Sequence, residues 1–297
     1  MSLSVSIDGN TRLVSMIDSP VRHSVSPATH SLAYKKMGIN AVFLVFDIQV
    51  EDLPAVMAAF RVMGGWDSTT VTMPCKQAII PFLDELSPTA ELAGAVNVVK
   101  KEENGNIVGY NSDGPGFIGN LTNNGVKIAD PTITLLGPGG AGSAILAQAA
   151  LEGAERVHVF ARENGCSYQN AFALKERIEG VTTCSVEIHA FEDTATLRAS
   201  IDESDILVNC TNVGMGNGNM ETPINPSLIK PGMIVAEVIN TPRETQLLKE
   251  AKKIGCKTLG GLGMNDRQAV VADCIRFGIN IPIEEVRDEL RKKEVVL

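Results

Sequence analysis

The chain has 297 residues, of which 44% are hydrophobic, and a formal net charge of −9. At about 150 residues per domain, this length predicts two domains that each bury a core. The acidic balance and the lack of a Lys/Arg cluster argue against a nucleic-acid-binding protein, which needs a basic face to neutralise phosphates. No apolar run approaches the ~18 residues of a membrane span, and no basic region followed by an apolar segment opens the chain. We therefore expect a cytoplasmic protein that binds neither nucleic acid nor membrane.

Cysteine and histidine usage gives no sign of a metal centre. The six cysteines are scattered without a C-x-x-C pair, which is typical of isolated thiols in a reducing compartment and not of a disulfide framework or a zinc knuckle. The four histidines show no metal-type spacing, so the sequence predicts no metal site. These residues are Cys75, Cys166, Cys184, Cys210, Cys256 and Cys274, and His23, His30, His158 and His189.

Up to Tyr110 the chain alternates strand-like and helix-like segments, which predicts an α/β domain. Strands are expected over 12–17, 41–46 and 69–72, and helices from Ala28 and Leu53. Two further strands, expected over 95–99 and 107–110, flank a polar turn and close this first domain.

An apolar strand that runs into a glycine-rich turn is the most informative feature of the chain. Residues 132–142 read TITLLGPGGAG, and a helix and a second strand, expected over 156–160, complete a βαβ unit. Gly137 allows a sharp turn, and Gly139 and Gly140 let backbone N–H groups approach a pyrophosphate at the helix N-terminus. Glycine clusters also punctuate ordinary turns, but the place of this cluster between a strand and a helix predicts dinucleotide binding.

The same alternation continues to about Ile254 and predicts a doubly wound sheet for the second domain. A helix from Asp113 leads into the βαβ unit. Three more strands and a helix are expected over 184–189, 206–208, 233–237 and 244–254. Two C-terminal helices are expected over 265–277 and 283–293, and their spacing alone assigns them to neither domain.

Several polar residues in the first domain are candidates for ligand binding. Ser24 and Ser26 lie just before a helix, where paired hydroxyls either grip a carboxylate or cap the helix, and capping alone is worth about 1 kcal/mol. Lys76 lies at the start of a helix, where the macrodipole disfavours a cation unless an anion or a substrate compensates. The alternative for Lys76 is an exposed, flexible surface lysine. Asp113 equally suits a helix cap.

Taken in order, several motifs resemble those of the shikimate and quinate/shikimate dehydrogenase family. They are HSVSP (23–27), VTMPCK (71–76), GAVN (94–97), GYNSDG (109–114), GPGGA (137–141), and GLGM (261–264) with Gln268. The resemblance covers nearly the whole chain. It implies an α/β fold with an N-terminal substrate domain (1–114 plus 265–297), a Rossmann-like doubly wound dinucleotide-binding domain (115–264), and an active site in the cleft between them.

The family is one of oxidoreductases that interconvert a ring ketone and a secondary alcohol on a cyclic hydroxy acid, with a nicotinamide cofactor. The resemblance implies that Ser24 and Ser26 bind the substrate carboxylate, and that Lys76 and Asp113 are the catalytic pair. The residues that it implies as contacts of the ring hydroxyls are Thr72, Asn97, Asp113 and Gln268. The chemistry is consistent, because hydride transfer to a carbonyl develops an alkoxide that a nearby ammonium group stabilises and protonates.

The resemblance also implies the residues that bind the cofactor. They are Gly137, Gly139, Gly140, Ala141, Arg162, Glu163, Thr211, Val213, Met215, Val238 and Gly261. The choice between NAD and NADP depends on the segment after the second strand of the βαβ unit, because a 2′-phosphate needs basic partners and a free ribose hydroxyl suits an acidic group. Arg162 is basic, but Glu163 beside it repels a phosphate, so we expect NAD in preference to NADP.

Three departures from the family pattern concern the substrate pocket. Thr70 stands where Asn is common, and Asn240 stands where a tyrosine is common. Polar residues over 265–267 replace a largely apolar stretch, although Asp266 and Arg267 also suit a solvated helix turn. These changes alter which ring substituents find a partner in the pocket.

Shikimate and quinate are therefore the expected substrates, and two alternatives stay open. The first is a dehydrogenase of a related or amino-substituted cyclic hydroxy acid. The second is a non-catalytic paralogue that binds dinucleotide or ligand without turnover, and the retention of both Lys76 and Asp113 favours an enzyme over it. The expected partner is a small-molecule substrate, with a homodimer left open.

Overall fold

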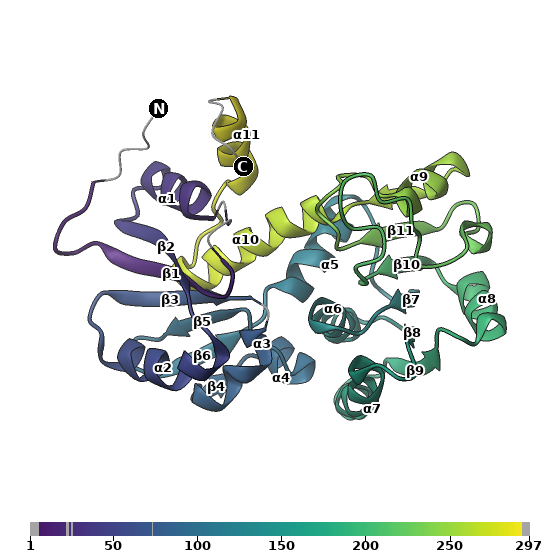
Figure 1. The fold of residues 1–297 in the computed structure, drawn as a ribbon, viewed down its shortest axis with the longest axis horizontal. Coiled ribbons are helices and arrows are strands. Elements are labelled where there is room, and N and C mark those ends of the chain that lie inside the picture. The colour runs from purple at the N-terminus through teal and green to yellow at the C-terminus, as the bar shows by residue number, and fades with distance from the viewer. Residues whose placement is uncertain (1–5, 22–23, 25, 73, 293–297) are drawn as a thin grey trace. The chain divides into compact units, whose positions relative to one another are not determined.

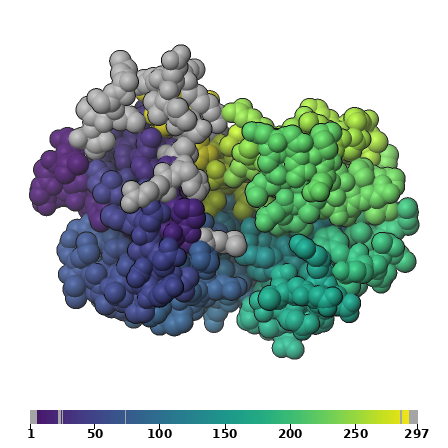
Figure 2. Space-filling model, viewed as in Figure 1, coloured from purple at the N-terminus to yellow at the C-terminus, as the bar shows by residue number. Residues whose placement is uncertain are grey.

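The computed structural model describes residues 6–21, 24, 26–72 and 74–292. The chain divides into two compact units. Unit 1 contains the described residues up to Glu91, Ala95–Ser112, and those from Ala269 onward, and unit 2 contains Leu92–Gly94 and Asp113–Gln268. In the space-filling view, purple and blue mark the first part of unit 1, and teal to green mark most of unit 2 (Figure 2). None of the described helices is long and apolar enough to cross a membrane.

Unit 1 is built on a six-stranded mixed sheet in the order β2-β1-β3-β5-β6-β4. Its strands are β1 (Arg12–Asp18), β2 (Ala41–Asp47), β3 (Trp66–Val71), β4 (Glu85–Leu86), β5 (Val98–Lys101) and β6 (Ile107–Tyr110). β1 pairs in parallel with β2 and β3, whereas β5 is antiparallel to β3 and β6. Ile17 is in register with Val71. The next residues, Asp18 and Thr72, therefore lie at the same end of the sheet.

Helices pack on both faces of this sheet (Figure 1). Those that begin in unit 1 are α1 (Ser26–Lys36), α2 (Leu53–Val62), α3 (Cys75–Ala78), α4 (Pro88–Ala93) and α11 (Ile283–Lys292), with 3₁₀ turns η1 (Val50–Asp52) and η2 (Ile80–Phe82). Successive side chains of a strand point to opposite faces, so Val14 and Ile17 belong to different cores. Ile17 packs with Met57 of α2, whereas Val14 packs with Leu32 of α1 and Val286 of α11.

Unit 2 is built on a six-stranded parallel sheet in the order β12-β11-β10-β7-β8-β9. Its strands are β7 (Thr132–Leu136), β8 (Arg156–Ala161), β9 (Ser185–Ala190), β10 (Ile206–Asn209), β11 (Ile234–Glu237) and β12 (Lys257–Leu259). The chain winds outward from β7 in one direction through β9, then returns to the other side of β7 at β10. This confirms the α/β fold class and the Rossmann-like doubly wound sheet, and the switch of direction lies between β7 and β10.

The helices of unit 2 cover both faces of its sheet (Figure 1). They are α5 (Asp113–Asn123), α6 (Gly140–Leu151), α7 (Cys166–Glu179), α8 (Thr194–Glu203), α9 (Gln246–Lys253) and the 3₁₀ turn η3 (Pro226–Leu228). Apolar residues of α8 and α9 share one core with β7, β10 and β11. The long helix α10 (Gly261–Phe277) belongs to unit 2 up to Gln268 and to unit 1 from Ala269.

The strand expected over 95–99 is shorter than its apolar pattern predicts, since β5 begins only at Val98. The Ala95 N–H donates to Ala90 O at 3.3 Å and so closes the end of α4. The Val96 N–H donates to Lys76 O at 2.9 Å. These bonds take both residues out of the sheet ladder. The helix expected from Ala28 likewise begins earlier, at Ser26.

Candidate active site

The glycine-rich turn lies at the carboxyl end of β7, beside the switch of direction in the sheet. Gly137 has φ +88°, a conformation that favours glycine. Its N–H donates to Phe160 O at 2.8 Å, and a Cβ at this position would lie 2.8 Å from Thr211 Cγ2. Open α/β sheets bind their ligands in the crevice at such a switch point, so the turn lies where a ligand is expected.

The N-terminus of α6 leaves room for a phosphate group. An added Cβ at Gly139 or Gly140 would meet no described heavy atom within 4 Å, whereas one at Gly142 would lie 2.2 Å from Gly137 O. The first N–H groups of a helix lack intrahelical partners, and the helix dipole favours an anion beside them. The residues present therefore fit the pyrophosphate of a dinucleotide. Ala141 lies between Gly140, which has space beside it, and Gly142, which packs against Gly137. The sequence prediction does not include this packing role of Gly142.

Asn209 ends β10 and organises the loop that follows it. Its Oδ1 accepts hydrogen bonds from the Thr211 N–H at 3.0 Å and the Thr211 hydroxyl at 2.7 Å, and its Nδ2 donates to Val213 O at 3.3 Å. Thr211 is thereby held beside Gly137, while Met215 is 53% exposed. Sequence reasoning selects Thr211, Val213 and Met215 but misses Asn209. The available signal was a polar residue at the carboxyl end of an apolar strand.

Val238 and Gly261 lie against each other where α10 begins. The Gly261 N–H donates to Ile239 O at 3.1 Å, and a Cβ at Gly261 would lie 2.4 Å from the carbonyl carbon of Val238. Only glycine permits this close approach of the helix to the loop after β11. The two predicted cofactor residues therefore come together at one end of the sheet of unit 2.

Arg162 and Glu163 follow directly after β8 and are both exposed. The Gly165 N–H donates to Arg162 O at 2.8 Å, which closes a turn before α7. This is the position after the second strand of a βαβ unit at which such folds recognise the ribose. The structure therefore places both residues at the position that the sequence analysis selects for the cofactor.

In unit 1, Ser24 has a structural role that the sequence left open. Its Oγ accepts a hydrogen bond from the Ser26 N–H at 3.2 Å, at the first residue of α1. This turn stabilises the helix start. The bond uses a lone pair of the Ser24 oxygen and not its O–H. The same hydroxyl can therefore still donate to a carboxylate. Ser24 can thus stabilise the start of α1 and bind a carboxylate at the same time.

Lys76 is the second residue of α3 and is half-buried near the fully buried Asp18. Burial raises the pKa of Asp18, and the N–H groups of Ser19 and Cys75 and the charge of Lys76 oppose that rise. Asp18 is thus a buried carboxyl group whose interaction with Lys76 favours its charged form, and the sequence prediction does not include it. Burial, together with Asp18, raises the pKa of the Cys75 thiol to about 11, so this thiol is not a nucleophile at neutral pH. Thr72 is half-buried at the same end of the sheet.

Asn97 is fully buried, and its side chain bonds to Ser112. The Nδ2 of Asn97 donates to Ser112 Oγ at 3.0 Å, and the Ser112 N–H donates to Asn97 Oδ1 at 2.8 Å. The Val71 N–H donates to Asn97 O at 2.8 Å, which places Asn97 beside the end of β3. The structure therefore brings Asn97 to the end of the sheet where Thr72 lies.

Asp113 and Gln268 belong to unit 2. Asp113 is the first residue of α5 and is buried, and Gly116 lies one turn later on the same helix. A Cβ at Gly116 would lie 2.7 Å from Gln268 Cα, so the backbones of α5 and α10 touch there. This contact brings the two predicted polar groups to the same part of unit 2.

Two of the family departures are engaged in packing. Arg276 donates from Nη2 to the Thr70 hydroxyl within unit 1. Arg267 donates from Nε to the side-chain oxygen of Asn123 at 2.8 Å when that amide is oriented to accept, which ties α10 to α5. Asp266 and Arg267 are half-buried and so do not form a solvated turn, and Asn240 is exposed.

Within each unit, the structure brings some of the predicted residues together. Thr72, Lys76 and Asn97 lie around the end of β3 in unit 1, and Ser24 lies at the start of α1. In unit 2, the glycine turn and the loop after β10 lie together at the switch of direction. His23 lies outside the described residues.

Comparison with known proteins adds independent findings. The family described as shikimate dehydrogenase substrate binding domain matches residues 16–99. A relative from Streptococcus uberis named shikimate dehydrogenase (NADP(+)) is 40% identical over 291 residues, which are 97% of this chain and 98% of the relative. A relative of the same name from Alkaliphilus metalliredigens is 37% identical over 284 residues, 95% of this chain and 96% of the relative.

A solved structure also resembles the whole chain. The shikimate 5-dehydrogenase of Listeria monocytogenes, in complex with shikimate and NAD, superimposes with a TM-score of 0.91 at 37% sequence identity. The match covers 97% of this chain and 99% of the Listeria chain.

Proposed function

The chain belongs to the shikimate dehydrogenase family of oxidoreductases, which use a nicotinamide cofactor, and on that premise we propose that it interconverts shikimate and its 3-dehydro ketone. Quinate, a related cyclic hydroxy acid, is the second substrate to test. The observation that carries the proposal is the position of Lys76, a half-buried residue near the point where β3 ends. Asp18 lies beside it, and Thr72 and Asn97 lie at the same end of the sheet.

Lys76 is proposed as the proton donor and acceptor. The cofactor, when bound, supplies or accepts the hydride. In the direction of reduction, the carbonyl oxygen gains negative charge, and the ammonium group of Lys76 stabilises it and gives up a proton to it. In the direction of oxidation, the neutral amine takes the hydroxyl proton. Asp113 is proposed as the second member of the catalytic pair.

Hydroxyl and amide groups are proposed to hold the substrate. The O–H groups of Ser24 and Ser26 donate to the ring carboxylate, and Thr72, Asn97 and Gln268 match the ring hydroxyls. A site that is built to bond a hydroxyl rejects an analogue without it, because its own buried polar groups are then left unpaired. These contacts would therefore select a polyhydroxylated ring.

The cofactor is proposed to bind unit 2 with its pyrophosphate at Gly139 and Gly140, and NAD is proposed over NADP because Glu163 disfavours a 2′-phosphate. The two curated relatives compared above are named for NADP(+), whereas the Listeria structure contains NAD. The cofactor preference therefore has to be measured on this chain itself. The homodimer and the cytoplasmic location also stay predictions from the sequence.

The decisive experiment measures reduction of NAD⁺ and NADP⁺ by shikimate and by quinate at alkaline pH. The wild type is compared with Lys76→Ala and with Lys127→Ala, which removes an exposed lysine outside the proposed site. We expect turnover with shikimate that is lost only in Lys76→Ala, since general acid–base catalysis contributes about 10² to 10⁴-fold.

Other outcomes lead to the two alternatives. Turnover only with a modified or amino-substituted ring would replace shikimate as the substrate. Binding of dinucleotide without turnover of any of these acids would indicate a ligand-binding paralogue. Equal activity of wild type and Lys76→Ala would remove Lys76 from the catalytic role.

A further inference from the structure

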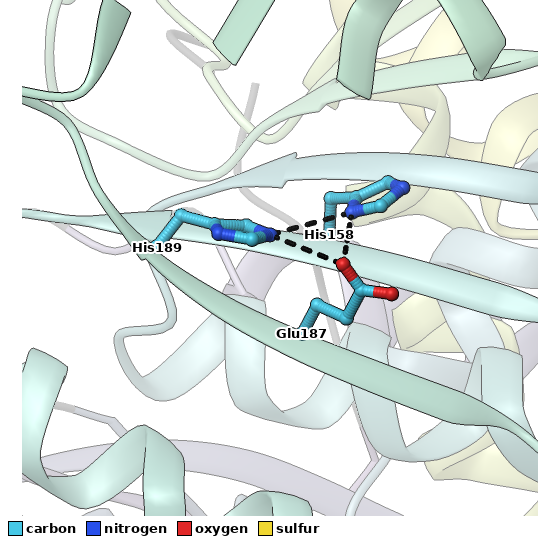
Figure 3. A group of neighbouring side chains, drawn as sticks. All are labelled: His158, Glu187 and His189. Carbon is cyan, nitrogen blue, oxygen red and sulfur yellow. Dashed lines mark hydrogen bonds and ion pairs between the residues drawn. The ribbon is translucent and has the colours of Figure 1, made fainter. Parts of the chain in front are cut away.

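A second cluster of chemically active side chains lies on the sheet of unit 2. Glu187 and His189 are two residues apart on β9 and so face the same side of the sheet. His158 on β8 is in register with Glu187 and faces that side too. Figure 3 shows the three side chains turned toward one another across the two strands. In the described parts of the chain, no other three His, Cys, Asp or Glu residues bring their ligand atoms this close together.

The spacing of the three atoms is unusual for hydrogen bonds. His158 Nδ1 lies 3.4 Å from His189 Nε2 and 3.4 Å from Glu187 Oε2, and His189 Nε2 lies 3.5 Å from the same oxygen. Good hydrogen bonds between such atoms are about 2.7–3.2 Å long. Ligands about 2.0–2.1 Å from a tetrahedral zinc ion lie about 3.3–3.4 Å from one another. The triangle therefore has the dimensions of one face of a metal tetrahedron.

The surroundings of His158 suit a metal ligand. Oε1 of Glu203, at the end of α8, lies 2.5 Å from His158 Nε2, although not in line with its N–H direction. A carboxylate on this side favours a proton on Nε2, which leaves the lone pair of Nδ1 for an ion. Metal-binding imidazoles commonly have such a carboxylate behind them.

The charge of the cluster favours a cation. Arg156 approaches Glu187 Oε1 at 3.7 Å and Glu203 Oε2 at 3.6 Å. It thus meets the outer oxygen of each carboxylate and leaves Glu187 Oε2 facing the imidazoles. With both histidines neutral, two carboxylates and one guanidinium leave one net negative charge.

Exposure at the cluster allows an ion to enter. The side chain of His158 is 3% exposed, that of His189 19% and that of Glu187 42%. One ligand is therefore fixed in the fold, and the carboxylate is free enough to adjust its distance. The partly exposed side of the cluster leaves room for water as a fourth ligand, as in zinc sites with three protein ligands.

We propose that His158, Glu187 and His189 form a binding site for a divalent transition-metal ion, with Zn²⁺ as the first candidate. Two imidazoles and one carboxylate are a donor set that suits zinc. A bound ion would link the edge strand β9 to β8 and so stabilise unit 2. The sequence prediction of no metal depended on spacing along the chain. It did not consider ligands from two strands that become neighbours only when the sheet forms.

The test titrates Zn²⁺ into untagged, chelator-treated protein by calorimetry and follows Co²⁺ binding by visible absorption. We expect one ion per chain. Cys166 and Cys274 are exposed thiols that also bind metal ions. Binding at them would give thiolate charge-transfer bands, so we expect a Co²⁺ spectrum without these bands. His189→Ala and Glu187→Gln should each lower the Zn²⁺ affinity at least about tenfold, and Glu203→Gln should lower it about 10–100-fold through His158.

Glu192→Gln is the matched control, because this exposed carboxylate lies just after β9 in the sequence but contributes no atom to the triangle. Its affinity should equal that of the wild type. Zn²⁺ at a few times its dissociation constant should also raise the Tm of the wild type and not of Glu187→Gln. Circular dichroism confirms that each variant is folded. The proposal is overturned if no stoichiometric binding occurs, or if Glu187→Gln and His189→Ala bind as the wild type does.

Discussion

At the turn after β8, Arg162 and Glu163 present one exposed cation and one exposed anion where we propose that the ribose of the cofactor binds. Removing the anion by Glu163→Gln should improve the use of NADP. Two unit charges 4 Å apart in bulk water repel by about 1 kcal/mol, and the value for water applies because Glu163 is exposed. We therefore expect kcat/KM for NADP⁺ to rise roughly fivefold relative to that for NAD⁺. Glu176→Gln on α7, which removes a similar exposed charge elsewhere, should leave the ratio unchanged, and an unchanged ratio in Glu163→Gln would remove this residue from cofactor selection.

Glu237 gives unit 2 a dependence of stability on pH. This residue ends β11 in register with Asn209, and it is 1% exposed. Burial raises the pKa of Glu237 to about 7, against the lowering effects of the Thr245 and Asn209 side chains. Because the folded-state pKa lies above the ordinary value of 4.5, the folded state binds this proton more tightly. The contribution of Glu237 to stability is therefore fully present below about pH 4.5, and this contribution is lost as the pH rises through 7.

Glu237→Gln should remove this loss. A shift of about 2.5 pKa units corresponds to at most about 3 kcal/mol at pH 8. The Gln side-chain oxygen can still accept the bond that Thr245 Oγ1 donates to Glu237 Oε2 at 2.8 Å. Urea unfolding followed by circular dichroism at pH 5 and pH 8 should show a gain at pH 8 alone. A variant whose pH dependence matches that of the wild type would contradict the assignment.

The βαβ unit depends on how closely α6 approaches the glycine turn. A Cβ at Gly142 would lie 2.2 Å from Gly137 O, so Gly142→Ala must move the helix away from the turn. Overpacking of this kind costs about 1–3 kcal/mol of unfolding free energy. It should also weaken dinucleotide binding, because the N–H groups of the helix start lose their position. Gly119→Ala in α5 is the control, since its Cβ meets nothing within 4 Å and alanine favours a helix. Chemical unfolding and calorimetric titration with NAD⁺ measure both effects, and equal results for the two variants would refute the close contact.

The elements that the sequence predicts best are those with sharp local signals. The run TITLL predicts β7 at Thr132–Leu136, because Pro131 and Gly137 limit the apolar run at both ends. Helix α8 is absent from the prediction, since its apolar residues recur only weakly at the helical period. Its start does carry a signal, because the Asp193 side chain accepts from the Thr196 N–H at 3.0 Å as a helix cap.

The candidate site follows the same rule. The turn at Gly139 and Gly140, which we propose to bind the cofactor through its own backbone, is visible in the sequence as a motif. Residues that act through a neighbouring strand are not. Asp18 lies beside Lys76 only after β1 has paired with β3, and Asn209 faces Glu237 only through the register of β10 with β11. Pairing of distant strands is set by the whole fold, which a pattern along the chain does not contain.

For the molecule as a whole, the return of the chain to unit 1 depends on a buried polar network. Asp273 in α10 accepts from the Tyr34 hydroxyl at 2.8 Å and from Arg276 Nη1 at 2.9 Å, and its Oδ2 lies 2.7 Å from His30 Nδ1. Burial raises the pKa of Asp273, but His30 and Arg276 outweigh it, so the pKa lies below its usual value. The stability that this carboxylate provides is therefore present above its ordinary pKa and is lost as the pH falls through the lower folded value. The network joins the C-terminal part of the chain to α1.

Asp273→Asn should therefore destabilise unit 1 selectively. The variant leaves the guanidinium of Arg276 buried without its anion, and breaking such a pair costs about 3–5 kcal/mol. Trp66 is the one tryptophan of the chain, lies in unit 1 and is 4% exposed. Its fluorescence reports on unit 1, whereas circular dichroism reports on both units. Two-domain proteins need not unfold in one step, so the fluorescence transition should move to lower urea while the remaining circular dichroism transition keeps its midpoint. Asp202→Asn, an exposed site on α8, should move neither. If both signals instead shift together in Asp273→Asn, the two units unfold as one cooperative structure, and an unmoved fluorescence midpoint would show that the network contributes little to unit 1.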